Sequence, residues 1–190
     1  GRLEAAQPLM EEKFISSCHQ AGAMFKKDRD HVVKNMQIAF RDLFELGAAL
    51  QKKEAKGAVK YIVISWLHSG LLIEGLTLRL DLYDQDFYCD EAETSVVWQP
   101  EFLLASHEKD MADIVTALKK QFIRMQHYEI DEIEREYVKY EWALLQKLLG
   151  DRLLDLLELM ENSGLEQTDD IVILYGGYMD TAEILWQKGA

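Results

Sequence analysis

Cysteine and proline are both scarce in this chain, which has two of each among its 190 residues. The two cysteines, Cys18 and Cys89, are too few for the disulfide framework of a small secreted domain, and they fit a reducing compartment. The first residues do not combine a basic segment with an apolar one, so no signal peptide is expected. We therefore expect a cytoplasmic protein.

The chain also lacks a long hydrophobic run. The longest apolar stretch, from Tyr61 to Ile73, is interrupted by polar residues and is too short to span a bilayer. The motifs that identify common enzyme classes are absent too: there is no glycine-rich phosphate loop, CxxC, HExxH, GxSxG or GxGxxG. We expect no membrane span and no cofactor, and no motif names a reaction.

Basic residues are in the minority. Lys and Arg number 21 against 34 Asp and Glu, a net charge of −13, so the average surface repels nucleic-acid phosphate and we expect no nucleic-acid partner. Hydrophobic residues make up 48% of the chain, enough to bury a core. The length predicts a single domain over residues 1–190, with residues 1–8 as a flexible N-terminal segment.

The acidic residues are concentrated in one part of the chain. Between Asp81 and Asp113 there are ten acidic residues and one base, a net charge of −9, whereas the stretch from Lys26 to Lys60 has a net charge of +4. Two interpretations stay open: solvated faces that discourage self-association, or an acidic surface that attracts a basic partner. The candidate partner-binding acids are Asp81, Asp84, Asp86, Asp90, Glu91 and Glu93.

Apolar residues three and four positions apart predict helices over residues 9–27, 30–55, from a cap at Ser106 to about 125, and over 131–160. Gly150 and Asp151 mark either a kink in the last of these or a break that starts a separate helix. Asp180 and Glu183 resemble a capping box for a terminal helix. The pattern indicates about five helices.

Between the helices the apolar period changes to two. Residues 60–68 suit a strand covered on both faces, and Ser69-Gly70 suits a two-residue hairpin turn. The leucines at positions 76, 78, 80 and 82 alternate with polar residues, residues 87–90 suit a short return strand, and 95–98 suit a fourth. Residues 171–175 suit either a strand or a helix. We predict an α+β fold with its helices packed on a small antiparallel meander of three to four strands.

Chemically active candidates come from the expected hairpin. A two-residue turn at Ser69-Gly70 pairs Ser65 with Glu74 and places Glu74 on the apolar face, where burial would raise its carboxyl pKa toward that of a general acid or base. His68 lies at the same turn. The alternative is a β-bulge at Gly75, which turns Glu74 toward solvent.

Metal ligands are the other chemical possibility. Asp84, Asp86 and Asp90 have the oxygen ligands that Ca²⁺ prefers, but an EF-hand reading from Asp84 puts Cys89 where the turn glycine belongs. Cys89 instead falls on the apolar parity, which predicts a buried residue. His107, Asp110 and Asp113 share one helical face, and the simplest interpretation is an exposed polar face.

The run from Leu144 to Met160 carries more leucine than one face of a surface helix needs. It is either a central helix or a seam with another chain, such as a homodimer interface, in which case Leu154 and Leu157 lie at the contact. We expect a non-catalytic protein-interaction module with an acidic surface and a basic protein partner. The alternative is a metal-assisted hydrolase or a carboxylate acid–base enzyme that uses Glu74, His68 and the neighbouring acids.

Overall fold

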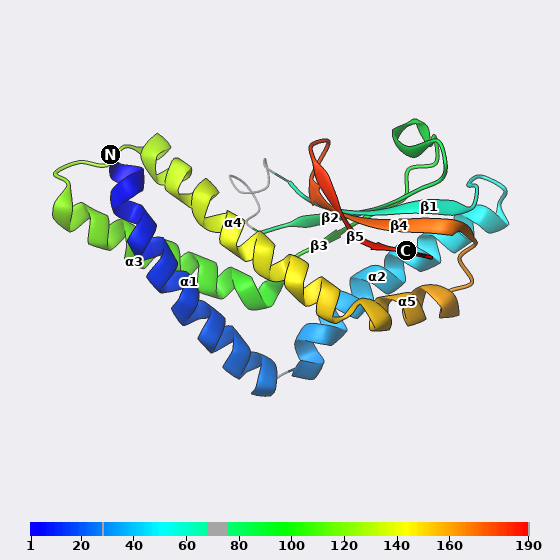
Figure 1. Ribbon diagram of the computed structural model, residues 1–190, viewed down its shortest axis with the longest axis horizontal. Coiled ribbons are helices and arrows are strands. Elements are labelled where there is room, and N and C mark those ends of the chain that lie inside the picture. Colours follow the sequence, from blue (N-terminus) through cyan, green and yellow to red (C-terminus); the bar gives the residue numbers. More distant parts are fainter. Residues whose placement is uncertain (28, 68–75, 190) are drawn as a thin grey trace.

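The computed structural model describes residues 1–27, 29–67 and 76–189 (Figure 1). Among them the α-helices are α1 (Arg2–Lys27), α2 (Arg29–Lys52), α3 (Glu101–Gln121), α4 (His127–Asp151) and α5 (Leu153–Asn162). The strands are β1 (Val59–Trp66), β2 (Leu78–Tyr83), β3 (Ser95–Trp98), β4 (Gln167–Gly177) and β5 (Ala182–Gln187). The expectation of an α+β fold with about five helices is confirmed.

The strands form one mixed sheet with the order β3-β2-β1-β4-β5. Strand β1 pairs antiparallel with β2 on one side and parallel with β4 on the other. The predicted antiparallel meander of three to four strands is therefore wrong, because only β1, β2 and β3 follow that pattern. The chain returns to the centre of the sheet after α3, α4 and α5, and a long crossover of this kind allows parallel pairing.

The predicted hairpin register is also wrong. Ser65 lies opposite Arg79, not Glu74, and Ile64 lies opposite Leu80. The observed register differs from the predicted one by five residues. Because this number is odd, the side chains of β2 lie on the opposite face from the one predicted relative to β1, and Leu80 and Leu82 lie beside Ile64 and Ile62 in the core. The last pair of this ladder is Trp66 opposite Leu78. The candidates His68 and Glu74, and Ser69, Gly70 and Gly75, lie outside the described residues.

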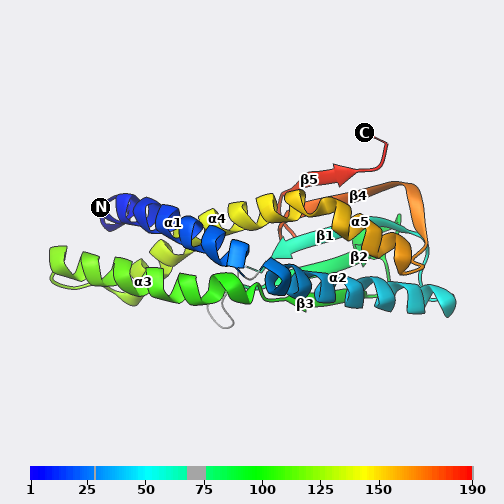
Figure 2. The same ribbon diagram turned by 90° about the horizontal axis from the view of Figure 1, so that it is seen from below.

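Helices α2 and α5 pack on the same face of the sheet (Figure 2). Phe40, Leu43 and Phe44 of α2 and Leu156 and Met160 of α5 are fully buried in this core. Together with the sheet they form a unit that we call the body. The helix expected over residues 30–55 is confirmed as far as Lys52, where α2 ends, and its apolar stripe packs in the core with the strands.

The helix boundaries resolve one open question and correct the expected starts of two helices. Helix α4 ends at Asp151 and α5 begins at Leu153, so Gly150 precedes a break, with Arg152 at the junction. Helix α3 begins at Glu101, before the expected cap at Ser106, and α1 begins at Arg2, so residues 2–8 are helical. None of the helices, as far as the described residues extend, is long and apolar enough to cross a bilayer.

The structure decides the type of one short segment that the sequence left open and corrects the predicted type of two others. Residues 171–175 belong to strand β4, and the predicted terminal helix is instead strand β5. Phe87–Cys89 is a 3-10 helix, η2, and not a return strand. Phe87 has a φ of 52°, which is incompatible with an extended strand.

Helices α1 and α3 and the first half of α4 form a three-helix arm beside the body (Figure 1). The arm has its own apolar core, in which Met10, Ile114, Leu118 and Ile133 are buried. Helix α4 belongs to both units, because its second half, including Trp142, packs into the core of the body. At that point the Trp142 ring stacks on Trp66 of β1 with centroids 4.5 Å apart.

Two glycine-to-alanine substitutions test this packing in opposite directions. At Gly176 an added Cβ would lie 2.3 Å from the carbonyl oxygen of Thr181, so Gly176→Ala should lower the unfolding free energy by about 1–3 kcal/mol. At Gly150, in the last turn of α4, the nearest atom would be 4.0 Å away, and Gly150→Ala should raise it by about 0.5–1 kcal/mol. Urea unfolding of both variants measures these changes, and equal effects would contradict the placement of the β4–β5 hairpin.

Candidate functional site

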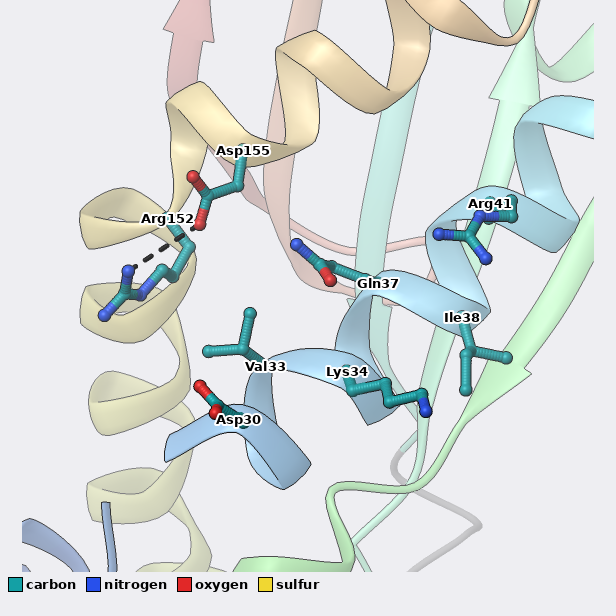
Figure 3. A pocket seen from close by; sticks show the side chains of 8 residues that line it. All are labelled: Asp30, Val33, Lys34, Gln37, Ile38, Arg41, Arg152 and Asp155. Atoms are coloured by element: carbon teal, nitrogen blue, oxygen red, sulfur yellow. Dashed lines mark ion pairs between the residues drawn. The ribbon is translucent and has the colours of Figure 1, made fainter. Parts of the chain in front are cut away.

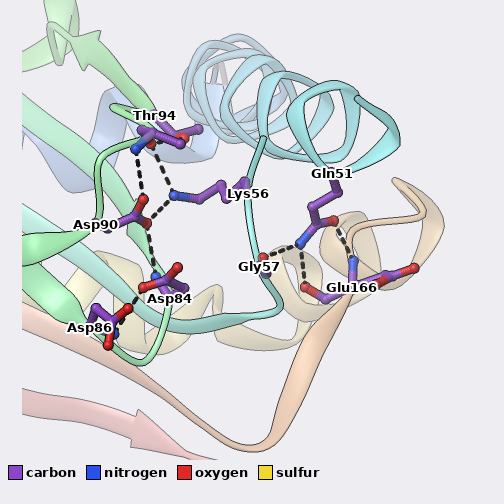
Figure 4. Close-up of polar contacts among 9 residues, drawn as sticks. Gln51, Lys56, Gly57, Asp84, Asp86, Asp90, Thr94 and Glu166 are labelled. Carbon is purple, nitrogen blue, oxygen red and sulfur yellow. Dashed lines mark hydrogen bonds and ion pairs between the residues drawn. The ribbon is translucent and has the colours of Figure 1, made fainter. Parts of the chain in front are cut away.

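The loop that joins β2 to β3, residues 84–94, is held in place by a buried ion pair (Figure 4). The Lys56 ammonium donates to Asp90 and, at 3.1 Å, to the carbonyl oxygen of Ala92. The Asp90 carboxylate also accepts backbone N–H bonds from Asp84 at 3.0 Å and from Ala92 at 2.9 Å. Burial opposes ionisation of Asp90, but these donors outweigh it and hold its pKa below the ordinary value.

Asp81 is buried as well, on strand β2. The Nε atom of Arg79 donates to both of its carboxylate oxygens, at 2.9 and 3.0 Å. Burial raises the pKa of Asp81, and the contact with Arg79 only partly opposes that rise. Asp81 and Asp90 therefore have internal partners and, contrary to the expectation from charge patterning, do not face solvent.

The exposed acids of this segment are Asp86, Glu91 and Glu93. Glu93 contacts the second guanidinium nitrogen of Arg79 at 3.0 Å. Asp84 is half-buried, and one of its carboxylate oxygens accepts the backbone N–H of Asp86 at 2.9 Å. No group of three His, Cys, Asp or Glu side chains within the described residues is arranged to hold a metal ion. The structure therefore uses Asp84 and Asp90 to shape the loop.

Aromatic packing of Phe87 also holds the loop of residues 84–94 against the sheet. The Phe87 ring lies 4.7 Å from that of Tyr61 and 5.2 Å from that of Tyr83, measured between centroids. These contacts accompany the unfavourable positive φ of Phe87. Two residues later Cys89 is exposed, so its predicted burial is wrong: the 3-10 turn breaks the alternation on which that prediction relied.

A second polar cluster lies inside the arm. His107 of α3 is 4% exposed, and its two ring nitrogens contact two carboxylates of α4. Nδ1 lies 2.8 Å from Glu141 and Nε2 lies 3.0 Å from Glu134. Burial alone would lower the pKa of His107, but the two carboxylates outweigh it and raise the pKa to about 9. His107 is therefore a cation at neutral pH, donating to both glutamates.

Asp110, one helical turn after His107, extends this cluster to α1. Its carboxylate accepts hydrogen bonds from the Tyr137 hydroxyl at 2.6 Å and from the Ser17 hydroxyl. Burial and the nearby Asp110 carboxylate raise the pKa of Tyr137 well above its ordinary value, so this hydroxyl remains a donor. We call His107, Asp110, Glu134, Tyr137, Glu141 and Ser17 the polar layer.

The polar layer lies between the two apolar cores. On α3 it falls between Leu103, which packs in the body, and Ile114, which packs in the arm. The two glutamates approach His107 from opposite ring nitrogens, so one metal ion could not bind both of them and the imidazole. The cluster is thus suited to joining helices rather than to catalysis or metal binding.

The prediction that His107 and Asp110 lie on an exposed face is wrong, because α4 and α1 cover that face. Asp113 does lie nearer the surface, where it pairs with Lys13 at 2.7 Å. The signal that was missed is the spacing of Glu134 and Glu141. At seven residues apart they share a face of α4 that can receive one cation.

A groove of about 630 Å³ lies between α2 and the α4–α5 junction (Figure 3). Lys34 and Arg41 line it from α2, and Arg152 lines it from the junction, 3.6 Å from Asp155. Asp30 adds a second carboxylate. Cations and carboxylates are mixed here without converging on one point, so the groove has no evident catalytic arrangement.

The leucine-rich run divides between core and surface. Leu156 and Met160 are buried in the body, and Leu157 is half-buried against the same core. Leu154 projects from α5 and is 80% exposed. Of the two residues expected at a seam with another chain, only Leu154 is mostly accessible.

Comparison of the chain with protein-family models, with curated proteins and with solved structures found no match.

The polar layer predicts a loss of stability at high pH. The pKa of His107 is about 9 in the folded state, against about 6.5 for an unperturbed histidine. Its contribution is fully present below about pH 6.5 and disappears as the pH rises through about 9, lowering the unfolding free energy by up to about 3 kcal/mol. Urea unfolding from pH 6 to 10 should show this slope in the wild type and not in His107→Gln. Parallel profiles would contradict the assignment.

The buried ion pair between Lys56 and Asp90 predicts that neutralising Asp90 strongly destabilises the fold. Asp90→Asn removes the charge that compensates Lys56, whose side chain is fully buried, and should cost about 3–5 kcal/mol of unfolding free energy at pH 7. Asp86→Asn makes the same substitution at an exposed position and should change stability by less than about 0.5 kcal/mol. Equal losses in urea unfolding would show that Asp90 is not buried against Lys56.

Proposed function

We propose that the protein is a non-catalytic interaction module that binds a basic protein partner through an acidic surface. The observation that supports this is that the acidic residues of the loop 84–94 fall into two groups, one that makes contacts within the fold and one that is exposed to solvent. Asp84 and Asp90 hold the loop from inside, and Asp86, Glu91 and Glu93 are displayed outside. We call these three exposed residues the acidic surface.

Preorganisation is what makes such a surface useful for binding. A loop that is already held by a buried ion pair and by Phe87 loses little conformational entropy when a partner docks. Exposed carboxylates on it steer a positively charged partner and set its orientation, and salt screens both effects. Asp81 and Asp90, which have internal partners, are not part of the proposed contact.

The described titratable groups are arranged differently from a catalytic site. The carboxylate of Asp90, the imidazole of His107 and the carboxylate of Asp110 each have two or more polar contacts with other parts of the fold. Such contacts support a structural use of these groups. They leave the exposed surface, rather than the interior, as the place for function.

Exposed Leu154 on α5 supports a second, apolar contact with a partner or with another copy of the chain. A single exposed leucine contributes little by itself. It therefore ranks behind the acidic surface.

The test is affinity capture from the source cells with three baits, followed by mass spectrometry. The double variant Asp86→Asn/Glu91→Gln should capture the specific partner several-fold less than the wild type, because two steering charges are lost. The control Glu158→Gln/Glu161→Gln makes an equal charge change on the exposed side of α5 and should capture it as the wild type does. Capture by the wild type should fall as salt is raised.

Equal recovery of every protein by the two double variants would contradict the proposal. So would capture that is insensitive to salt. Because both variants change only exposed side chains, their folding can be verified by matching circular dichroism and unfolding curves.

A further inference from the structure

Strand β3 is at one end of the sheet, with β2 on its inner side only (Figure 2). The backbone N–H of Leu82 donates to the carbonyl oxygen of Thr94 at 3.0 Å, so these residues form a hydrogen-bonded pair. In an antiparallel ladder such pairs recur every second residue, which makes Val96 and Trp98 the next ones. The N–H and C=O groups of Ser95 and Val97 therefore point away from β2, toward the open edge.

A groove runs along this edge, between β3 and α2. It encloses about 310 Å³ and is lined on one wall by Val96, Val97, Trp98 and Gln99 and on the other by Asn35, Ile38, Ala39 and Asp42. Val97 is 58% exposed and lies on the face of β3 away from α2, since its neighbours Val96 and Trp98 pack into the core, and Ile38 of α2 is 45% exposed. Apolar surface is therefore available on both sides of the open edge. A helix beside an open strand edge is the geometry in which extended peptides add to a sheet.

The edge strand is short, four residues, but it lacks the other usual features that block strand pairing. Its sequence, Ser-Val-Val-Trp, contains no proline, lysine or other charge, and its pairing with β2 shows no bulge. Proteins ordinarily protect open edges with such features, because an unprotected edge pairs with other chains. An unblocked edge next to a groove suits a specific binding function.

The charges around the groove favour a basic segment as its occupant. Asp42 and Glu101 line the groove, Glu93 precedes β3 by two residues, and no Lys or Arg is among the described lining residues. Two copies of this chain paired through β3 would bring these carboxylates together, which is unfavourable. A basic segment would instead place its cations opposite them.

We propose that an extended, basic segment of a partner protein adds to the sheet beside β3 and becomes its new edge strand. The outward N–H and C=O groups of Ser95 and Val97 bond its backbone. Its side chains alternate between the two faces of the sheet, so that apolar ones cover Val97 on one face and Lys or Arg side chains face Asp42 and Glu101 on the side of α2. This inference rests on the proposed function and specifies how the partner of the acidic surface binds.

Val97→Pro tests the backbone contacts. Proline removes only the outward N–H, which β2 does not use, and it is tolerated at such edge positions. Val97→Thr is the matched control, because it keeps the N–H and the preference for a strand. The probe is a short synthetic peptide of alternating lysine and valine, and its counterpart with glutamate in place of lysine is the charge control.

The basic peptide should bind the wild type and Val97→Thr, with at least about tenfold weaker binding to Val97→Pro, in a titration followed by amide chemical shifts. The glutamate peptide should not bind. In the wild type, the basic peptide should slow hydrogen exchange at the Ser95 and Val97 amides, and this measurement applies even if Val97→Pro does not fold. Unchanged affinity of Val97→Pro, or unchanged exchange at these amides, would overturn the proposal.

The two proposals fail separately. If the partner captured by the wild type is lost with Asp86→Asn/Glu91→Gln but retained by a folded Val97→Pro, the acidic surface stands and strand addition is wrong. If no partner depends on the acidic surface, the proposed function fails whatever the peptide does. A concentration-dependent dimer that disappears in Val97→Pro would identify a second copy as the occupant and overturn the choice of a basic partner.

Discussion

The arrangement of the whole molecule depends on one buried cation, the imidazolium of His107 held between Glu134 and Glu141. Helix α4 contributes to the apolar cores of both the arm and the body, and this ion pair joins it to α3 at the point where one core ends and the other begins. An apolar contact there would join the helices in several registers, whereas paired charges require one. Asp110, through Tyr137 and Ser17, extends the same constraint to α1.

The body uses the same principle to organise its surface. A lysine with no exposed side-chain area, Lys56, pairs with Asp90, and this contact determines where the loop between β2 and β3 lies. The loop in turn positions the exposed carboxylates of Asp86 and Glu91. Charges buried inside the chain thus define the geometry of the exposed charges, and under the proposed function this would make the loop a rigid binding element.

The acidic surface and the edge of β3 are consecutive in the chain, since residues 84–94 lead directly into Ser95. In the proposed binding mode they would supply complementary parts of one site: charge that attracts and orients a basic segment, and backbone groups that hold it. Helix α2 forms the outer wall of the groove while Phe40 and Phe44 on its other face are buried in the body. A segment bound there would contact elements whose positions the core already determines.

The sequence by itself determined the elements whose apolar period is strong. The helix of residues 29–52, the alternation of Leu78, Leu80 and Leu82, and the buried character of β1 are local patterns, because helix and strand periods select which side chains face a core. The α+β class follows from the same signals, which also indicated an interruption at Gly150 and Asp151 without deciding between a kink and a break. The sequence also showed where the acidic residues concentrate.

Only the tertiary structure decided which residues meet. The parallel pairing of β1 with β4, the five-residue difference in the β1–β2 register and the strand identity of β5 depend on contacts between distant segments, on which local periodicity carries no information. The same holds for His107 with Glu134 and Lys56 with Asp90. Whether a charged residue lies in solvent or inside depends on what covers it, and the covering helix or loop comes from another part of the chain.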